Sequence, residues 1–245
     1  MRTPIRIATA AAALCIGALG ISACGLLPGK TFRDDATVSK KITAIRLDND
    51  SGGLTVHGGA AGGKVSVHRA VTYHGGRPEG PTHRVTDGVL VLGDCGTNCS
   101  VDYTVEVPAG LPVSGETSDG ALNLSKVGAV KVTTSSGAIE LDGVTGPVDV
   151  ETSNGEITGR ALSGGHIGAE TSNGEIDLRP ATPQDVRAET SNGSITVQVP
   201  KSHYRISADT SSGDKDISVP DDPSGRFHLD LTTSNGDITA KTASG

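Results

Sequence analysis

The stretch of sequence that decides the fold is residues 148–158, Val-Asp-Val-Glu-Thr-Ser-Asn-Gly-Glu-Ile-Thr. Apolar and polar residues alternate in it, so that Val148, Val150 and Thr152 share one face while the acidic residues between them share the other. After the Asn-Gly pair, Ile157 points inward again between two outward polar residues. Alternation with a period of two, bounded by Ser, Asn and Gly, is typical of short β-strands joined by a turn.

The tetrapeptide Thr-Ser-x-Gly inside this stretch occurs seven times, at successive spacings of 17, 18, 19, 19, 20 and 23 residues. A degenerate earlier copy spans residues 49–56. Such a period predicts one structural unit per repeat, stacked on its neighbours. Glycine reaches positive φ in a turn without the steric cost that other residues bear. We expect this role for Gly120, Gly137, Gly155, Gly174, Gly193, Gly213 and Gly236.

Two β architectures compete for this pattern. An Asn-Gly turn between alternating runs is a strong hairpin signal, which would give an antiparallel meander. The nearly constant phase of the motif favours a solenoid, and two Phe, three Tyr and no Trp suit its thin aliphatic core. Ser, Thr and Asn at equivalent turn positions also suit hydrogen-bonded ladders between coils. We predict an all-β fold, a β-solenoid or β-helix-like stack of short strands with repeats of 17–23 residues.

The first 23 residues indicate a lipoprotein signal peptide. Arg2 and Arg6 precede a short apolar run that ends in small residues, as in secretory signals. The sequence Ile-Ser-Ala-Cys at residues 21–24 resembles a bacterial lipobox, which implies a lipid on Cys24. Two acyl chains there would hold the protein stably on a membrane. We therefore predict a lipid-anchored protein on the extracytoplasmic face of the cell membrane.

Three further segments follow from composition. Residues 24–40 are polar and contain Gly and Pro, which predicts a flexible tether. Residues 41–245 then form the β-repeat domain, irregular over 41–112 and regular over 113–245. Without the signal, 19 Lys and Arg face 28 Asp and Glu, a formal charge of −9. Such an acidic chain argues against nucleic acid as the partner, and against anionic lipid as the main one.

Cys95 and Cys99 remain once the signal and the lipid site are set aside. A close pair in an exported protein predicts a structural disulfide, and the Gly, Thr and Asn between them suit a tight turn. A zinc site would need further ligands at matching spacing, which the sequence lacks. A redox-active pair is the other alternative, although its usual spacing is C-x-x-C.

Several of these motifs together resemble the DUF4097 family of β-strand-repeat proteins, which is also labelled an adhesin family. The resemblance rests on the repeated Thr-Ser-x-Gly-(Glu/Asp/Ser)-Ile, the C-x3-C turn and the Tyr-Thr-Val-Glu-Val-Pro strand at residues 103–108. It covers roughly residues 42–240. It implies a right-handed solenoid-like fold and an envelope location, and it brings no catalytic site. Some relatives are linked with envelope-stress responses.

Carboxylates recur in phase with the repeat. If coils stack about 4.8 Å apart, Glu151, Glu170 and Glu189 form an acidic ladder on one face. Adjacent carboxylates repel, and a hard cation such as Ca²⁺ would relieve that repulsion through oxygen ligands. The alternative is a solvated acidic stripe screened by salt, which we favour. No cofactor is expected.

The sequence favours a binding protein over an enzyme. A catalytic site needs a local, non-repeating cluster of groups, whereas these acids follow the repeat. The seven histidines are scattered, and Gly-x-Ser-x-Gly is absent. We therefore predict a non-catalytic envelope lipoprotein that presents a β-repeat surface to an envelope glycan, another envelope protein or a host surface. An envelope-stress sensor is the alternative, and a polysaccharide-acting β-helix enzyme is a third; the oligomeric state is not indicated.

Overall fold

The computed structural model describes residues 29–59 and 64–243, and every regular element in them is a β-strand. The prediction of an all-β stack of short strands is confirmed. No helix in the described part is long and apolar enough to span a membrane. Cys24 and the predicted signal peptide lie outside the described residues.

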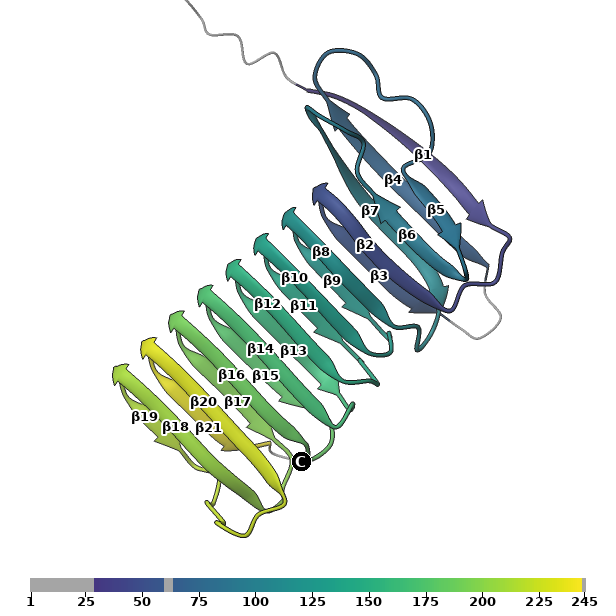
Figure 1. Cartoon of the computed structure of the whole chain (residues 1–245). Helices are drawn as coiled ribbons and strands as arrows, with labels where there is room; N and C mark the ends of the chain where they lie inside the picture. The colour runs from purple at the N-terminus through teal and green to yellow at the C-terminus, as the bar shows by residue number, and fades with distance from the viewer. Residues whose placement is uncertain (1–28, 60–63, 244–245) are drawn as a thin grey trace, which may run out of the picture.

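One repeat forms one coil of the stack, as β12 (Val148–Asn154) and β13 (Ile157–Leu162) show. β12 lies in one sheet, the chain turns at Gly155, and β13 lies in the opposite sheet (Figure 1). Val148, Val150 and Thr152 are buried and Ile157 is fully buried. The alternation in the sequence therefore gives the inward face of each strand, as expected.

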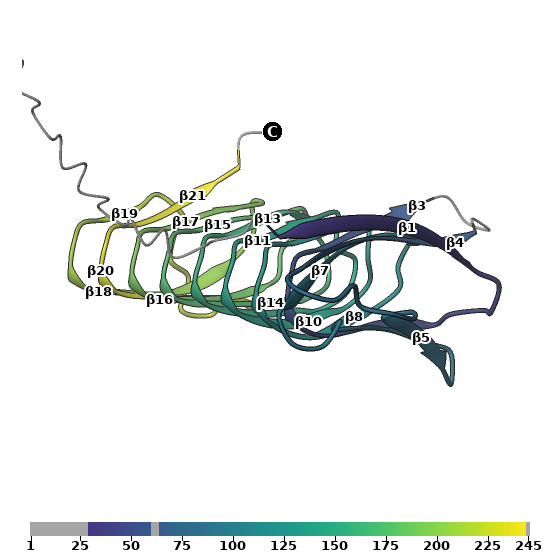
Figure 2. The same ribbon diagram turned by 90° about the horizontal axis from the view of Figure 1, so that it is seen from above.

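The coils build two sheets that face each other across the core (Figure 2). The eleven-stranded sheet contains, in spatial order, β1 (Lys30–Val38), β4 (Val65–Tyr73), β7 (Cys99–Pro108), β3 (Leu54–Gly59), β9 (Leu122–Ser125), β11 (Ile139–Asp142), β13, β15 (Ile176–Pro180), β17 (Ile195–Val199), β21 (Ile238–Thr242) and β19 (Lys215–Ile217). The ten-stranded sheet contains β18 (Tyr204–Ser212), β20 (Phe227–Asn235), β16 (Asp185–Asn192), β14 (His166–Asn173), β12, β10 (Val130–Ser136), β8 (Val113–Asp119), β2 (Ala44–Ser51), β6 (Val89–Gly93) and β5 (His83–Thr86).

Most neighbouring strands are parallel and in register, so equivalent residues form columns through the core. Val148 pairs with Ile167, which pairs with Val186, and Ile139 pairs with Ile157 in the other sheet. These columns are buried aliphatic residues of the kind that pleated surfaces favour. The parallel pairing settles the choice between the two predicted architectures, because a meander would be antiparallel throughout.

Spatial order departs from chain order at both ends of the stack. The last coil in sequence, β20–β21, lies between the β16–β17 coil and the β18–β19 coil. Leu229 and Leu231 of β20 are thereby buried, while Ile206 and Ala208 of β18 stay partly exposed at the end. The more apolar coil occupies the interior position, which removes more apolar area from water. At the other end β2 and β3 lie directly beside β8 and β9, with β4–β7 outside them.

The prediction of a flexible tether over residues 24–40 is wrong for its second half. Residues 30–38 form β1, which pairs antiparallel with β4 along its whole length. Its partly buried residues alternate with exposed ones, and one of them is Asp34, whose partner Arg69 lies on β4. Because polar Asp34 occupies an inward position, β1 lacks the alternation of apolar and polar residues that predicts a strand.

Candidate functional site

The seven predicted turn glycines form one row along the edge of the stack. A Cβ added at Gly174 would overlap the carbonyl oxygen of Gly155 in the next coil, and each of the others meets a backbone carbonyl in the same way. The expected positive φ holds for five of them, but not for Gly155 and Gly174. Close approach of neighbouring coils is therefore the constraint that all seven share.

Side chains flanking these glycines form the ladders that the repeat predicted. Thr171 Oγ1 donates to Gly155 O of the neighbouring coil at 3.1 Å, and other repeat threonines make the same contact. Asn173 Nδ2 donates to Asn154 Oδ1 at 3.1 Å, and Asn192 Nδ2 donates to Asn173 Oδ1 at 3.0 Å. These bonds join successive coils and leave the asparagine row exposed.

The predicted acidic ladder lies on the outer face of the ten-stranded sheet. Glu151 pairs in register with Glu170, and Glu170 with Glu189. Glu189 also receives a hydrogen bond from Arg187 at 2.8 Å. Within the described residues, no group of three or more His, Cys, Asp or Glu side chains is arranged to hold a metal ion. The Ca²⁺ site stays a prediction without structural support, and Arg187 already offsets part of the charge.

Cys95 and Cys99 are joined by a disulfide in the connection between β6 and β7. Their Cα atoms are 6.0 Å apart, and Gly96 in the enclosed turn has a positive φ. The bridge closes a short loop at the same edge of the stack as the turn glycines, because β7 begins at Cys99 and runs parallel to β3. The disulfide lies beside this turn, and neither cysteine lines the hollow described next.

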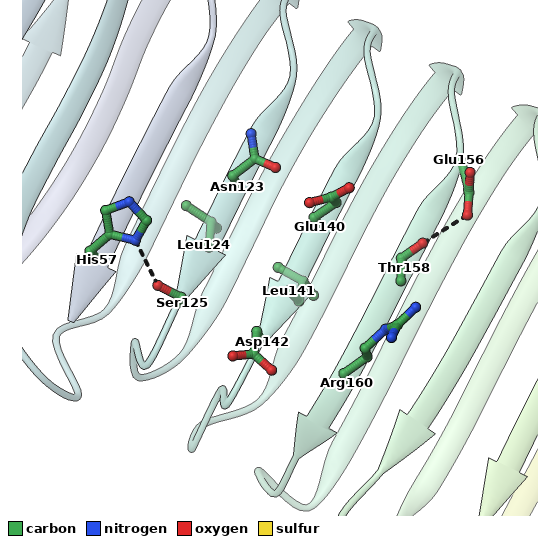
Figure 3. A pocket seen from close by; sticks show the side chains of 10 residues that line it. All are labelled: His57, Asn123, Leu124, Ser125, Glu140, Leu141, Asp142, Glu156, Thr158 and Arg160. Atoms are coloured by element: carbon green, nitrogen blue, oxygen red, sulfur yellow. Dashed lines mark hydrogen bonds between the residues drawn. The ribbon is translucent and has the colours of Figure 1, made fainter.

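A polar hollow of about 480 Å³ lies on the outer face of the eleven-stranded sheet (Figure 3). It crosses four adjacent strands, β3, β9, β11 and β13, and its polar side chains stand at outward positions of those strands. Strand register places them in rows, because Ser125 pairs with His57 and with Asp142, which in turn pairs with Arg160. The polar lining is His57, Asn123, Ser125, Glu140, Asp142, Glu156, Thr158 and Arg160.

Hydrogen bonds connect the side chains that line this hollow. Ser125 Oγ lies 3.0 Å from His57 Nδ1 and 3.3 Å from the carbonyl oxygen of Val56, within hydrogen-bond distance of both. Thr158 Oγ1 donates to Glu156 Oε1 at 2.9 Å (Figure 3). In the described residues no carboxylate hydrogen-bonds to His57, so the His57–Ser125 pair has no third group of the kind that orients the base in a catalytic triad.

The hollow was not predicted from the sequence, although the repeat contains the necessary signal. Counting from each turn glycine, the third residue gives Asn123, Glu140 and Thr158, and the fifth gives Ser125, Asp142 and Arg160. Both positions point outward on the second strand of a coil. The residues differ from coil to coil, so the hollow is a local chemical feature built on a regular frame.

A second polar cluster is buried between the sheets at the N-terminal end. Arg69, whose side chain is 9 % exposed, donates from Nε and Nη2 to the Asp34 carboxylate at 2.6 and 2.7 Å. These hydrogen bonds from Arg69 lower the pKa of Asp34. Thr82 receives a hydrogen bond from Arg69 Nη1 and accepts from the Tyr103 hydroxyl, and burial raises the pKa of Tyr103 to about 12. Through these hydrogen bonds the cluster links β1 and β4 to Thr82, directly before β5, and to Tyr103 of β7.

No curated protein matches this chain. A candidate adhesin from Parabacteroides distasonis is 13% identical, with 88% of this chain and 98% of that one covered and a TM-score of 0.43. A candidate adhesin from Bacteroides fragilis is 14% identical, with coverages of 87% and 97% and a TM-score of 0.43. A candidate cell adhesion protein from Clostridium sporogenes is 14% identical, with coverages of 87% and 100% and a TM-score of 0.37.

The family comparison is more informative than these distant likenesses. The sequence model of the Toastrack DUF4097 family matches residues 104–244, which is 141 of the 245 residues. The matched part runs from β7 to the end of β21 and so contains all seven turn glycines. The predicted resemblance is confirmed, and the chain belongs to the Toastrack DUF4097 family.

Proposed function

We propose that this chain is a non-catalytic envelope lipoprotein that binds an extended polar ligand along the outer face of its eleven-stranded sheet, as an adhesin does. The observation that carries the proposal is the polar hollow across β3, β9, β11 and β13. It is continuous with the outward rows of the following coils, where Asp177 and Arg179 occupy the next equivalent positions. A long ligand can therefore contact several coils at once.

The chemistry of the hollow suits a hydroxyl-rich ligand such as an envelope glycan. Glu140 and Asp142 offer carboxylate oxygens that accept from sugar hydroxyls, and Arg160 offers guanidinium donors. Asn123 both donates and accepts, which matches a hydroxyl in either role. Hydrogen bonds to charged groups contribute more than neutral ones, so a few such contacts suffice to orient a sugar.

Binding without catalysis is supported by the way these groups are arranged. Hydrolysis of a glycan needs two carboxyl groups in different roles, one of them held as an acid by its surroundings. Glu140 and Asp142 stand side by side on one exposed strand face, with similar access to solvent. These two carboxyl groups are not differentiated in the way that a hydrolase requires.

The test of binding uses the chain from Gly25 onward, which keeps every described strand, and purified cell-wall polymer that can be sedimented. We expect co-sedimentation of the protein, and at least a roughly tenfold weaker apparent affinity for an Asn123→Ala/Arg160→Ala variant, since each lost charged hydrogen bond is worth about 1.5 kcal/mol or more. The matched control is Ser114→Ala/Lys131→Ala on the outer face of the ten-stranded sheet. Equal binding by the two variants, or release of reducing ends from the polymer, would refute the proposal.

The anchor is tested separately. A Cys24→Ala variant of the full chain should leave the membrane fraction for the soluble fraction and lose the mass of the acyl groups. A Cys15→Ala variant serves as the control, because Cys15 lies inside the apolar run of the predicted signal. Unchanged fractionation and mass in the Cys24 variant would remove the lipid anchor from the proposed function and leave the binding surface unaffected.

A further inference from the structure

The charges of the chain are divided unevenly between its two parts. Residues 30–112 contain nine Lys and Arg and nine Asp and Glu, so they are formally neutral. Residues 113–245 contain ten Lys and Arg against nineteen Asp and Glu. The whole formal charge of −9 beyond the signal therefore lies on the regular coils. The N-terminal end of the stack is electrostatically different from the rest of the molecule.

A groove of about 670 Å³ at this N-terminal end combines apolar walls with lysines. It lies between the end of β1, the start of β4 and the segment that follows β7. Its apolar residues include Val38, Pro108 and Leu111, and its charged residues are Lys40, Lys41 and Lys64. Among the described residues no carboxylate lines it, whereas each of four other surface hollows contains at least one.

The three lysines are free to bind an external anion. All three are exposed, and within the described residues none of their ammonium groups forms an ion pair. Residues 60–63, which precede Lys64, are Ala-Ala-Gly-Gly and bring no charge. Lysine side chains pack their aliphatic stems on apolar surface while their ammonium groups reach outward. Three unpaired ammonium groups around an apolar groove therefore match a ligand that carries anionic groups beside apolar ones.

The groove lies at the outermost end of the stack. β1 is the edge strand of the eleven-stranded sheet, and in Figure 1 it lies at the opposite end of the molecule from β18 and β19. β1 extends over nine residues, about 30 Å, from Lys30 to Val38 beside the groove. A flat surface that touches this end therefore lies along β1, and the acidic coils project away from it.

We propose that this lysine groove docks the N-terminal end of the stack on an anionic phospholipid surface. Lys40, Lys41 and Lys64 bind headgroup phosphates, and the apolar residues between them contact the boundary between headgroups and acyl chains. The acidic coils are repelled by the same surface, so the stack stands end-on and its polar hollow remains open. The docking does not depend on a lipid at Cys24, which would only raise the local concentration of the groove at the membrane.

The experiment measures binding of the chain from Gly25 onward to phosphatidylcholine vesicles with and without phosphatidylglycerol. The test variant is Lys40→Ala/Lys41→Ala/Lys64→Ala. The matched control is Lys131→Ala/Lys201→Ala/Lys241→Ala, which removes the same charge from exposed positions on the coils. We expect binding only when phosphatidylglycerol is present, a loss of at least about tenfold in the test variant, and less than a twofold change in the control. Added salt should weaken the binding of the unmodified chain.

Three outcomes would overturn the proposal. Equal losses in the two variants would show that net charge alone matters, and equal binding to both vesicles would show that the groove recognises no anion. Binding of soluble polyphosphate, together with no binding to vesicles that contain phosphatidylglycerol, would show that the groove takes a phosphate polymer and not a lipid surface. Melting temperatures of both variants within the error of the unmodified chain establish that a loss of binding is not a loss of folding.

Discussion

The two ends of the stack are closed by different means. At the N-terminal end, antiparallel strands β1 and β4 extend one sheet and the β5–β6 hairpin ends the other, with the Arg69–Asp34 pair between them. At the opposite end, the parallel coil β18–β19 is the outermost one, and its inward residues Ile206, Ala208 and Ile217 remain partly exposed. The first end is closed by added strands, and the second end is left as an edge.

The exposed edge of β18 is nevertheless occupied by the chain itself. The Asp221 carboxylate accepts from Ile206 N–H at 3.0 Å, and Asp222 N–H donates to Tyr204 O at 2.8 Å. Lys215 Nζ donates to Ala208 O at 3.0 Å. In a parallel sheet the backbone N–H and C=O groups of alternate residues point to the same side of the strand. The backbone groups of Tyr204, Ile206 and Ala208 are therefore the ones with which a further coil would pair. Side chains thus block an edge that would otherwise pair with another chain.

The largest loss of stability is expected at a turn glycine in the middle of the stack, because neighbouring coils on both sides prevent a shift. A Gly193→Ala substitution places a Cβ against the backbone oxygen of Gly174 with coils on both sides, and should lower the free energy of unfolding by about 3 kcal/mol or more. Gly213 has a similar positive φ, so the same change there should cost less only because the end coil can move outward. Urea denaturation followed by circular dichroism measures both, with Gly76→Ala, which has open space around it, as the control. Equal losses at Gly193 and Gly213 would show that the end coil is as constrained as the middle.

The next effect concerns the half-buried Arg69–Asp34 pair at the N-terminal end. An Arg69→Ala substitution leaves the Asp34 carboxylate without its Arg69 donors and removes one of the two hydrogen bonds that Thr82 accepts. Breaking a buried ion pair costs roughly 3–5 kcal/mol, and because the Asp34 side chain is 44 % exposed, water offsets part of this, so we expect about 2 kcal/mol. Arg187→Ala, which removes an exposed pair from the coils, should cost less than about 0.5 kcal/mol in the same denaturation experiment. Similar costs for the two would mean that the cluster does not close this end.

The sequence predicts the coil well because each coil repeats its own local rule. Val148, Val150 and Thr152 give the inward face, and the spacing of the glycines gives the register that aligns Glu151, Glu170 and Glu189. The ends follow no such rule. Neither the insertion of β20–β21 nor the pairing of β1 with β4 leaves a local pattern, because each depends on contacts between residues far apart in the chain.

The polar hollow is intermediate between the coils and the ends in how far the sequence predicts it. Its frame is the repeat, so the outward positions of Asn123 and Glu140 could be assigned from sequence once the register was known. Its chemistry depends on which coils become neighbours, because His57 reaches Ser125 only when β3 lies beside β9. The 62 residues that separate these strands contain β4 to β8 and give no sign that the two strands meet.

At the exposed edge of β18 we expect a smaller effect on stability, together with association between copies of the chain. Lys215→Ala/Asp221→Ala removes two of the blocking contacts and should cost less than about 1 kcal/mol. The freed strand can pair antiparallel with a second copy centred on Ser207, which sets Arg205 opposite Asp209 in both halves of the dimer. We expect a concentration-dependent increase in molar mass by light scattering. Lys131→Ala/Asp149→Ala, an ion pair in mid-stack, is the control, and association of both variants would disconnect the effect from the edge.

The smallest effect is a pH dependence confined to the N-terminal end. Burial, followed by the charge of Arg69, lowers the pKa of His83 below its ordinary value near 6.5, so the folded chain binds fewer protons there than the unfolded chain. Stability from this group is therefore complete above about pH 6.5 and declines as the pH falls through the folded-state pKa. A His83→Gln variant should show a shallower loss of melting temperature between neutral and mildly acidic pH than the unmodified chain. The exposed His166→Asn on the coils should leave that slope unchanged; if it flattens the slope equally, the acid sensitivity belongs to the whole stack and the two ends do not differ in this respect.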